Sequence, residues 1–437
     1  ATALAVLNAR DPVVRTKDAD GKSVVDAAAT SAARAKAQEL INAFRNWLIS
    51  PDNTEVADRL HKKYNEMFNS IRLPVFTGEH LTFPTLSTAW KTPGRSLRPH
   101  QKAGIWRIIS NGNTLLAHCV GAGKSAEMIA AGVEMKRMGL AKKPLYVVPN
   151  HMVESGQFAS DFMSLFPGSR ILAAQRKDFA RANRKQLLSK IATGDWDAVV
   201  IGHSTFGLIP MSEDYARQFV NVQLADMREA LAEAQNDNSG GGRAKKRRVK
   251  DIENAIESME NRLERMIARG KRDDLLSFDE LGTDYLFVDE AHNFKKPYIR
   301  TQKGNVKGVQ TSDSARALDL WMKTEYFHQL RPGRSITFAT GTPVTNTLGE
   351  VFVMMRYLAP QMMRKLGIAH FDAWASAFGQ TQSVIERDVS GGAWRETTRF
   401  NRFVNLPELM QLWRSIADVQ TAEMLKLPVP ELDTGKP

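Results

Sequence analysis

The stretch NTLLAHCVGAGKSAEM (113–128) joins an apolar run to a glycine loop, with Lys124 and Ser125 directly behind it. Gly121 and Gly123 carry no Cβ atom, so backbone amides in this loop can approach a phosphate. Lys124 would hold the β- and γ-phosphates, and the Ser125 hydroxyl would ligate Mg²⁺. The pattern predicts a site for ATP and Mg²⁺. The residues expected around the phosphates are Gly121, Ala122, Gly123, Lys124, Ser125 and Ala126.

A pair of adjacent carboxylates ends the apolar run of DYLFVDEAHNFK (284–295). Asp289 would hold Mg²⁺ through water, and Glu290 would orient and polarise the attacking water. Adjacent residues of a strand point to opposite faces, so one acid can serve the metal and the other the water. Together with Lys124 these acids are the candidate catalytic residues. We interpret His292 as a coupling residue, because no second His or Cys at ligand spacing accompanies it.

A hydroxyl-rich turn follows the apolar run of SITFATGTPV (335–344). Thr340, Gly341 and Thr342 could hydrogen-bond the acidic pair and transmit the nucleotide state to other parts of the chain. An ordinary Thr-Gly turn would explain this segment in isolation. Its position after the glycine loop and the acidic pair favours the coupling role.

Short apolar runs precede these polar segments along the chain. They cover residues 113–118, 144–149, 197–202, 284–289 and 335–340. Such runs are typical of a parallel sheet buried on both faces, and their alternation with helical segments predicts a doubly wound α/β fold. Ligands of such folds bind beyond the carboxyl ends of the strands, which is where each polar segment begins.

Helical periodicity marks the segments outside these runs. Residues 24–70 read as helices, with a break at Pro51. Within 211–280 two amphipathic stretches joined by a glycine-rich turn predict an antiparallel helical hairpin. Its second helix begins with RAKKRRVK, in which six of eight residues are basic. This run predicts either DNA contact or a solvated face, and the candidate DNA ligands in it are Lys245, Lys246, Arg247 and Arg248.

The last part of the chain offers no catalytic candidate. Residues 383–400 read as a strand pair around Ser390-Gly391-Gly392. Residues 405–428 are expected to be helical after Pro407, with Leu409, Leu412, Ile416 and Val419 on one face.

Composition narrows the choice of partners. Lys plus Arg number 60 against 48 acidic residues, a formal charge of +12, which suits a partner made of phosphates or simply a basic soluble protein. Cys119 is the only cysteine, so an intrachain disulfide is excluded and a reducing, cytoplasmic setting is favoured. No apolar run approaches the roughly 20 residues that span a bilayer, so we expect no membrane partner.

Five segments occur in an order typical of one family. They are LRPHQKAGIWRI (97–108), AHCVGAGKS (117–125), LYVVPNHMV (145–153), VDEAHNF (288–294) and TGTPVTNTLGEV (341–351). This series resembles the first RecA-like lobe of the Swi/Snf-type, DEAH-box related ATPases of superfamily two. The chain is most similar to the helicase section of large phage and plasmid helicase–methylase polypeptides. His118 stands where the full Walker pattern has glycine, but many motors of superfamily two share the form seen from Ala117 to Ser125.

The resemblance implies an ATP-dependent translocase or helicase acting on double-stranded DNA. It implies that Gln101 contacts adenine, and that the DNA path is lined around Pro149, Asn150, His203 and Ser204. Such motors close a second RecA-like lobe, with its arginines, over ATP, and no second sheet follows Pro343. Both ends look like cuts in a longer polypeptide, so the second lobe and a fused methyltransferase are expected elsewhere in it. We expect this chain alone to bind ATP·Mg²⁺ and hydrolyse it very slowly.

Two other functions stay open at this point. A nucleotide-gated DNA-binding module would use the same loop without meaningful catalysis. A DNA adenine methyltransferase is disfavoured, because the chain has no consecutive prolines and no glycine-rich cofactor loop other than the one before Lys124. The expected division is an N-terminal helical region and connector (1–95), the first lobe in two parts (96–210 and 281–360), the hairpin insertion (211–280) and a helical and β-hairpin extension (361–437).

Overall fold

The structure is a computed structural model of the 437-residue chain. It describes residues 2–7, 12, 14–17, 23–69, 72–92, 96–236, 242–273, 276–295, 301, 314–345, 349–387 and 394–426. The chain forms two compact units. The sheet unit comprises Phe76–Pro297, Ser314–Thr342 and Asp418–Pro437, and the second unit comprises Ala1–Val75, Tyr298–Asp313 and Pro343–Ala417. The sheet unit thus ends its central part at Thr342 and also includes residues from Asp418 onward. The predicted bounds of the first lobe stay a prediction.

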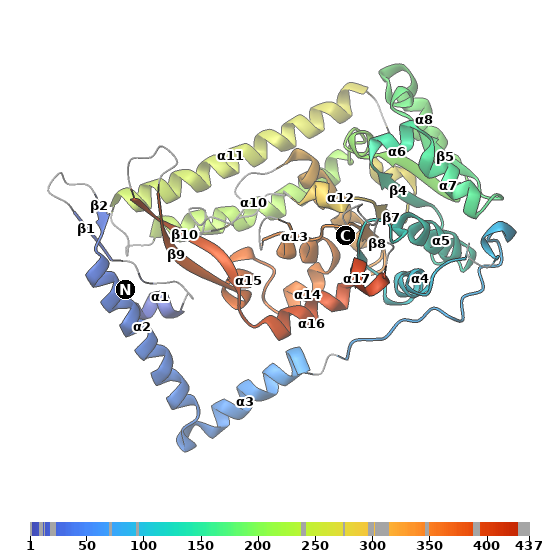
Figure 1. The fold of residues 1–437 in the computed structure, drawn as a ribbon. Helices are drawn as coiled ribbons and strands as arrows, with labels where there is room; N and C mark the ends of the chain where they lie inside the picture. Colours follow the sequence, from blue (N-terminus) through green and yellow to red (C-terminus); the bar gives the residue numbers. More distant parts are fainter. Residues whose placement is uncertain are drawn as a thin grey trace. The chain divides into compact units, whose positions relative to one another are not determined.

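A seven-stranded sheet in the order β11-β3-β8-β7-β4-β6-β5 forms the centre of the sheet unit. Figure 1 labels four of its strands, β4, β5, β7 and β8. The strands are β3 (Thr114–His118), β4 (Pro144–Val148), β5 (Ile171–Ala174), β6 (Ala198–Gly202), β7 (Tyr285–Val288), β8 (Ile336–Ala339) and β11 (Ala417–Gln420). Every recorded pairing among β3 to β8 is parallel. This confirms the doubly wound, RecA-like α/β class and all five expected strands. β5 and β11 were not predicted.

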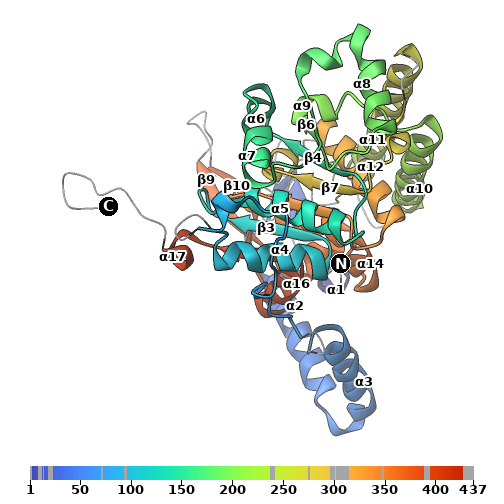
Figure 2. The same ribbon diagram turned by 90° about the vertical axis from the view of Figure 1, so that its right-hand side faces the viewer.

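Helices cover both faces of this sheet (Figure 2). On one face α4 (Pro99–Asn111), α5 (Lys124–Arg137) and α7 (Gln157–Leu165) share an apolar core with alternate strand residues. Tyr146 and Phe287 stack there with ring centroids 4.7 Å apart. The other strand residues point away from this core, toward the side on which α12 (Ala315–Leu330) lies. The remaining short helices of the unit are η3 (Thr88–Trp90), α6 (Asn150–Glu154), η4 (Arg176–Phe179), α8 (Arg181–Thr193), α9 (His203–Phe206), η5 (Phe278–Leu281), η6 (Ala291–Phe294) and α17 (Ala422–Leu425).

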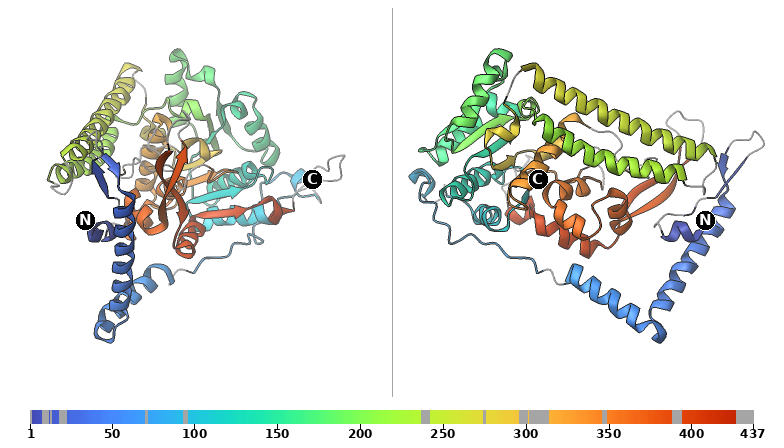
Figure 3. Two further views of the ribbon diagram at one scale, coloured as in Figure 1. Left: turned by 60° about the vertical axis from the view of Figure 1, so that its left-hand side comes forward. Right: turned by 180° about the vertical axis from the view of Figure 1, so that it is seen from behind.

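The insertion between β6 and β7 is a helical hairpin, as predicted. Its helices, α10 (Glu213–Asn236) and α11 (Gly242–Asp273), run side by side in every view (Figures 1 and 3). The expected apolar stripes meet between them, and their buried members include Val220, Leu224, Met227, Met259 and Leu263. Two hydrogen bonds close the base of the hairpin: Phe278 N donates to Pro210 O (2.7 Å), and Ser212 N donates to an Asp279 carboxylate oxygen (2.9 Å).

The second unit holds the expected amino-terminal helices and the expected strand pair. Its elements are α1 (Thr2–Leu7), β1 (Arg15–Lys17), β2 (Ser23–Val25), α2 (Ala27–Leu48), η1 (Pro51–Asn53), α3 (Thr54–Tyr64), η2 (Asn65–Asn69), α13 (Gly349–Leu358), α14 (Pro360–Lys365), α15 (Phe371–Phe378), β9 (Gly379–Arg387), β10 (Trp394–Phe403) and α16 (Leu406–Ile416). β9 and β10 pair antiparallel, with Trp394 opposite Arg387, and the expected Ser390-Gly391-Gly392 turn lies outside the described residues.

The expectation of a helix continuing to residue 428 is wrong. α16 ends at Ile416 and buries Leu409, Leu412 and Ile416 as predicted, but Val419 lies in β11 with 38% of its surface exposed. Pairing with the edge of the sheet outweighs the local helical spacing here.

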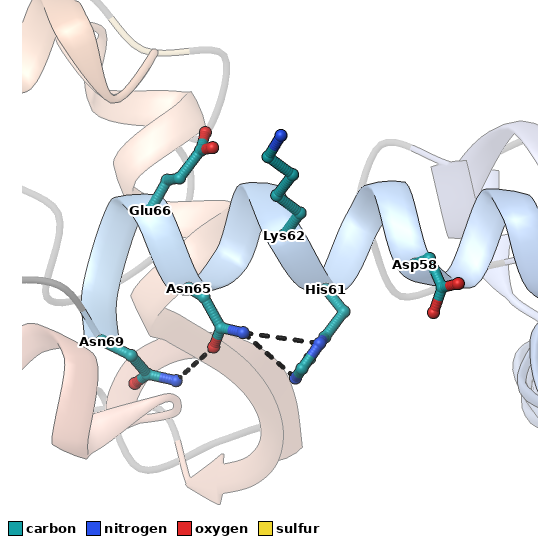
Figure 4. Close-up of a pocket in the computed structure, with 6 residues that line it drawn as sticks. All are labelled: Asp58, His61, Lys62, Asn65, Glu66 and Asn69. Carbon is teal, nitrogen blue, oxygen red and sulfur yellow. Dashed lines mark hydrogen bonds between the residues drawn. The ribbon is translucent and has the colours of Figure 1, made fainter.

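Polar side chains of α3 and η2 line a shallow surface hollow (Figure 4). Asn65 lies 3.2 Å from His61 Nε2 and accepts a hydrogen bond from Asn69 (2.6 Å). These interactions join neighbouring turns of one exposed helix, and none of the predicted site residues takes part. Among the described residues, no helix is both long and apolar enough to cross a membrane.

Candidate nucleotide-binding site

The glycine loop lies between the carboxyl end of β3 and the amino end of α5, as the sequence predicts. Gly121 and Gly123 have φ angles of 84° and 91°, a region that L side chains rarely adopt. The first N–H groups of α5 have no acceptor within the helix and point toward the loop. Lys124 is 8% exposed, and its Nζ donates to the carbonyls of His118 (3.1 Å) and Cys119 (3.3 Å). Ser125 and Ala126 follow it in the first turn.

Two side chains of α4 contact the backbone of the glycine loop at Ala122. Gln101 Nε2 donates to Ala122 O (3.0 Å), and a ring nitrogen of His100 lies 2.9 Å from the same oxygen. Gln101 Oε1 accepts from Arg98 N (2.8 Å), so both ends of the amide have partners in the protein. A Cβ atom on Gly123 would lie 2.1 Å from Gln101 Nε2, which explains why this position requires glycine. The adenine contact of Gln101 stays a prediction.

The acidic pair comes directly after β7, at the same carboxyl edge. Asp289 is 5% exposed; burial, with a smaller contribution from Glu290, raises its pKa to about 6, and Lys124 acts in the opposite direction. Lys124 is thus close enough to Asp289 to act on its carboxylate, and a site shared by the glycine loop and the acidic pair stays a prediction. Glu290 has φ 48°, and its N–H donates to an Asp289 carboxylate oxygen (2.9 Å). The expectation that strand alternation separates the two acids is wrong, because β7 ends at Val288 and a left-handed turn positions them instead.

The hydroxyl-rich turn contacts the acidic segment as predicted. His292 Nδ1 lies 3.0 Å from Thr340 Oγ1 and 3.0 Å from a Glu290 carboxylate oxygen. Thr342 N donates to Thr340 Oγ1 (3.1 Å). A Cβ atom on Gly341 would lie 3.3 Å from a Val120 methyl carbon, so this turn also lies against the glycine loop. The three motifs therefore meet at one edge of the sheet.

Sequence reasoning missed Lys295 in this group. Its side chain is buried, and Nζ donates to Thr342 O (2.6 Å), which ties the acidic segment to the hydroxyl-rich turn. The available signal was a lysine directly after the Asp-Glu-Ala-His-Asn-Phe series.

The expected DNA-path residues fall into two groups. Asn150 and Ser204 are exposed and adjacent, since Asn150 Oδ1 accepts from both Ser204 N and Ser204 Oγ (3.1 Å each), and Pro149 precedes them as the N-cap of α6. His203 is different. It is 5% exposed, its Nε2 lies 2.8 Å from Asp289 O, and burial lowers its pKa to about 4. Its ring supports the backbone of the acidic pair, and a place for His203 on the DNA path stays a prediction.

The basic run begins α11, as expected. Lys245, Lys246, Arg247 and Arg248 all lie in its first turns, and Lys246 is exposed. The side chains of Lys245, Arg247 and Arg248 are not among those that the structure describes.

His118 replaces the Walker glycine, and its side chain is fully buried. Its ring lies between two carboxylates, 3.2 Å from Glu127 Oε1 and 3.1 Å from Asp418 Oδ2. Burial by itself lowers the pKa of His118, but the bonds to Asp418 and Glu127 outweigh it and raise the pKa to about 9. Burial also raises the pKa of the Glu127 carboxyl, against the lowering effect of His118. Sequence reasoning missed this group because Asp418 is 300 residues away.

Comparison with known proteins gives two family matches. Residues 106–421 match the family described as "Probable helicase domain", and residues 2–70 match a domain of unknown function. The chain is 25% identical over 451 residues to Defense against restriction protein B of Escherichia phage P1, covering 93% of this chain and 19% of that protein. It thus spans about a fifth of this curated relative. A Sulfolobus solfataricus SWI2/SNF2 ATPase core in complex with dsDNA has a TM-score of 0.38 at 15% identity, over 75% of this chain and 45% of that one, which is too weak to carry a structural conclusion.

Proposed function

Since this chain belongs to the "Probable helicase domain" family, we propose that it is the nucleotide-binding lobe of an ATP-dependent motor that moves along double-stranded DNA. The observation that carries this proposal is the meeting of three motifs at one sheet edge. Lys124 influences the pKa of Asp289, and His292 joins the acidic segment to Thr340.

The donors at this edge suit the cofactors ATP and Mg²⁺. Mg²⁺ prefers oxygen ligands and binds through one or two carboxylates plus substrate phosphates, a set that Asp289 and Ser125 would complete. Bound Mg²⁺·ATP supplies the phosphoanhydride and the neutralising charge. The protein holds the phosphates with Lys124 and the loop amides from Gly121 to Ala126, and Glu290 orients and polarises the attacking water.

The proposed coupling route starts at the water-activating acid. Glu290 contacts His292, His292 contacts Thr340, and Lys295 reaches the carbonyl of Thr342. A change at the γ-phosphate would therefore shift the hydroxyl-rich turn. For DNA we propose phosphate contacts at Asn150 and Ser204, with a second set from residues 245–248 at the start of α11. Phosphate contacts of this kind give affinity without reading sequence.

Turnover is proposed to require parts beyond this chain. A second RecA-like lobe would supply arginines, which are worth roughly 10³–10⁵ in rate at related phosphoryl-transfer sites. We place that lobe, and a fused or associated DNA methyltransferase, in a longer polypeptide, in line with a relative five times as long. The relative's name attaches it to defence against restriction, and a similar role for this protein in the cytoplasm of a phage-infected cell is part of the proposal.

The alternative is a nucleotide-gated DNA-binding module without significant catalysis. The hairpin favours it: hydrogen bonds between residues 210–212 and 278–279 close its base, and a basic helix held in such a hairpin can grip DNA without any turnover. The two functions differ in their need for Glu290, because only a motor requires a residue that activates water for ATP hydrolysis.

Binding of a fluorescent ATP analogue with Mg²⁺ tests the shared premise. Lys124→Ala should abolish binding, whereas Lys136→Ala, which removes an ion pair with Asp197 at the other edge of the sheet, should leave it unchanged. Failure of the unmodified chain to bind would refute the proposal.

A turnover assay then distinguishes motor from module. In the longer protein, Glu290→Gln should eliminate DNA-stimulated phosphate release while preserving ATP binding; a passive module would show no turnover to lose. Robust DNA-stimulated hydrolysis by residues 1–437 alone would contradict the need for a second lobe.

A further inference from the structure

The last strand of the sheet, β11, reaches the nucleotide loop through both its backbone and a side chain. Gln420 O accepts a hydrogen bond from Cys119 N (2.9 Å), the first residue after β3. Two residues earlier, Asp418 lies 3.1 Å from the ring of His118. β11 is therefore attached at the point where the chain leaves the sheet to form the loop.

The ring of His118 is held at both nitrogens. Its Nδ1 faces Glu127, on the first turn of α5, and its Nε2 faces Asp418. The main-chain oxygen of the same residue accepts from Lys124 Nζ (3.1 Å). One residue thus connects the strand that enters the loop, the helix that leaves it, the phosphate-binding lysine and β11.

The group is largely buried, and polar partners surround it. His118 and Glu127 are both fully buried, and Asp418 is 18% exposed by side chain. Arg107 of α4, itself 7% exposed, adds a second positive charge that favours the ionised form of Asp418. Gly104 leaves room for the glutamate, since a Cβ there would lie 2.7 Å from Glu127 Oε2. Buried charges without partners are strongly destabilising, so each member depends on the others.

We propose that His118 and Asp418 are positioning residues for nucleotide binding: by joining β11 to the start of the glycine loop, they hold the loop in the shape that accepts a triphosphate. This inference rests on the proposed ATP site, and Lys124 remains the residue that touches the phosphates. The nucleotide-binding unit then extends to Gln420, although the last of the five family motifs ends at residue 351.

The first test is the affinity of the full chain for a fluorescent ATP analogue with Mg²⁺. Asp418→Asn and His118→Gln should each weaken binding about tenfold or more, the size expected when a charge-assisted buried bond is lost. The double variant should be no weaker than the weaker single one, because both changes break the same connection.

The matched control is Asp197→Asn. Asp197 also forms an ion pair, with Lys136 at 2.8 Å, and accepts from Arg170 N (2.7 Å), but it precedes β6 at the opposite edge of the sheet. It should lower the melting temperature without changing ATP affinity. A merely structural role for Asp418 would give the same result as this control, and that outcome overturns the inference.

A second measurement needs no substitution and so does not depend on a variant folding. Hydrogen–deuterium exchange of the unmodified chain should show that Mg²⁺·ATP protects amides 417–420 together with those of 119–125. Protection of 119–125 alone overturns the inference and leaves the proposed function standing. Absence of any ATP binding, by either method, overturns the proposed function itself.

Discussion

Replacement of Gly123 by alanine tests how tightly the nucleotide loop is built. The residue has φ 91°, and a Cβ atom there would lie 2.1 Å from Gln101 Nε2, whereas real Cβ contacts are not shorter than 3.0 Å. The amide must therefore retreat by about 1 Å, the difference between these two distances. In doing so it would give up its bonds to Ala122 O and Arg98 N.

The expected loss of stability has two parts. An L residue in a left-handed conformation costs roughly 1–2 kcal/mol. Breaking two buried amide hydrogen bonds adds about 1 kcal/mol each, for a total of about 3–4 kcal/mol. Gly139→Ala is the matched control, because Gly139 has φ 71° with no other atom within 4 Å of a Cβ there. It should lose only the first part.

Urea denaturation followed by tryptophan fluorescence measures both variants, and ATP affinity should fall in Gly123→Ala alone. Combining Gly123→Ala with Gln101→Ala should cost less than the sum of the single changes, because the methyl group then has space. Equal stability losses for Gly123→Ala and Gly139→Ala would refute the reasoning, since the strain would then lie entirely in the backbone angle.

Three further predictions follow from the site and its support. Burial raises the pKa of Asp289 from 3.8 to about 6, so its ionised form destabilises the fold; at 1.36 kcal/mol per pKa unit the penalty is about 3 kcal/mol. Asp289→Asn should therefore raise the melting temperature above pH 6, with the gain fading as the pH falls toward 4, while Mg²⁺-dependent ATP binding is lost; no gain at pH 8 would contradict this. Changing residues 245–248 to alanine should weaken binding to duplex DNA and reduce the salt slope of log K by up to about 3–4; an unchanged slope would show a solvated face. Lys323, fully buried with Nζ donating to Phe206 O (2.7 Å) and paired with Asp319, should be structural: Lys323→Met should lower stability by about 3 kcal/mol without changing ATP affinity, and a selective loss of affinity would contradict that role.

Local sequence patterns predicted the elements whose burial follows one regular rule along their length. The five expected strands are continuous apolar runs because both faces of the sheet are covered, and each motif begins where such a run ends. β5 was missed because its apolar run, Ile171–Ala174, has only four residues, and the first three are partly exposed. The two hairpin helices were predicted because their apolar stripes pack against each other. Their pattern therefore does not depend on distant parts of the chain.

Other features depend on pairings between distant segments. Ala417–Gln420 has no strand pattern of its own, and its position comes from the edge of the sheet next to β3. His203 resembles a surface residue after a strand, yet the carbonyl of Asp289, 86 residues later, draws its ring inward. Glu290 adopts a left-handed conformation that no spacing rule for strands would suggest.

The histidine at the Walker glycine position shows why local and distant signals must be combined. A side chain at residue 118 would obstruct the phosphates if it pointed into the loop, and this explains the usual preference for glycine. Here the ring points instead between Glu127 and Asp418, so the loop pattern tolerates it. That solution requires a carboxylate from β11 and the missing Cβ of Gly104. Histidine in place of the Walker glycine, taken alone, weakens the case for a phosphate site. In this fold it is accommodated because β11, the last strand of the sheet, supplies Asp418 as a partner for the ring.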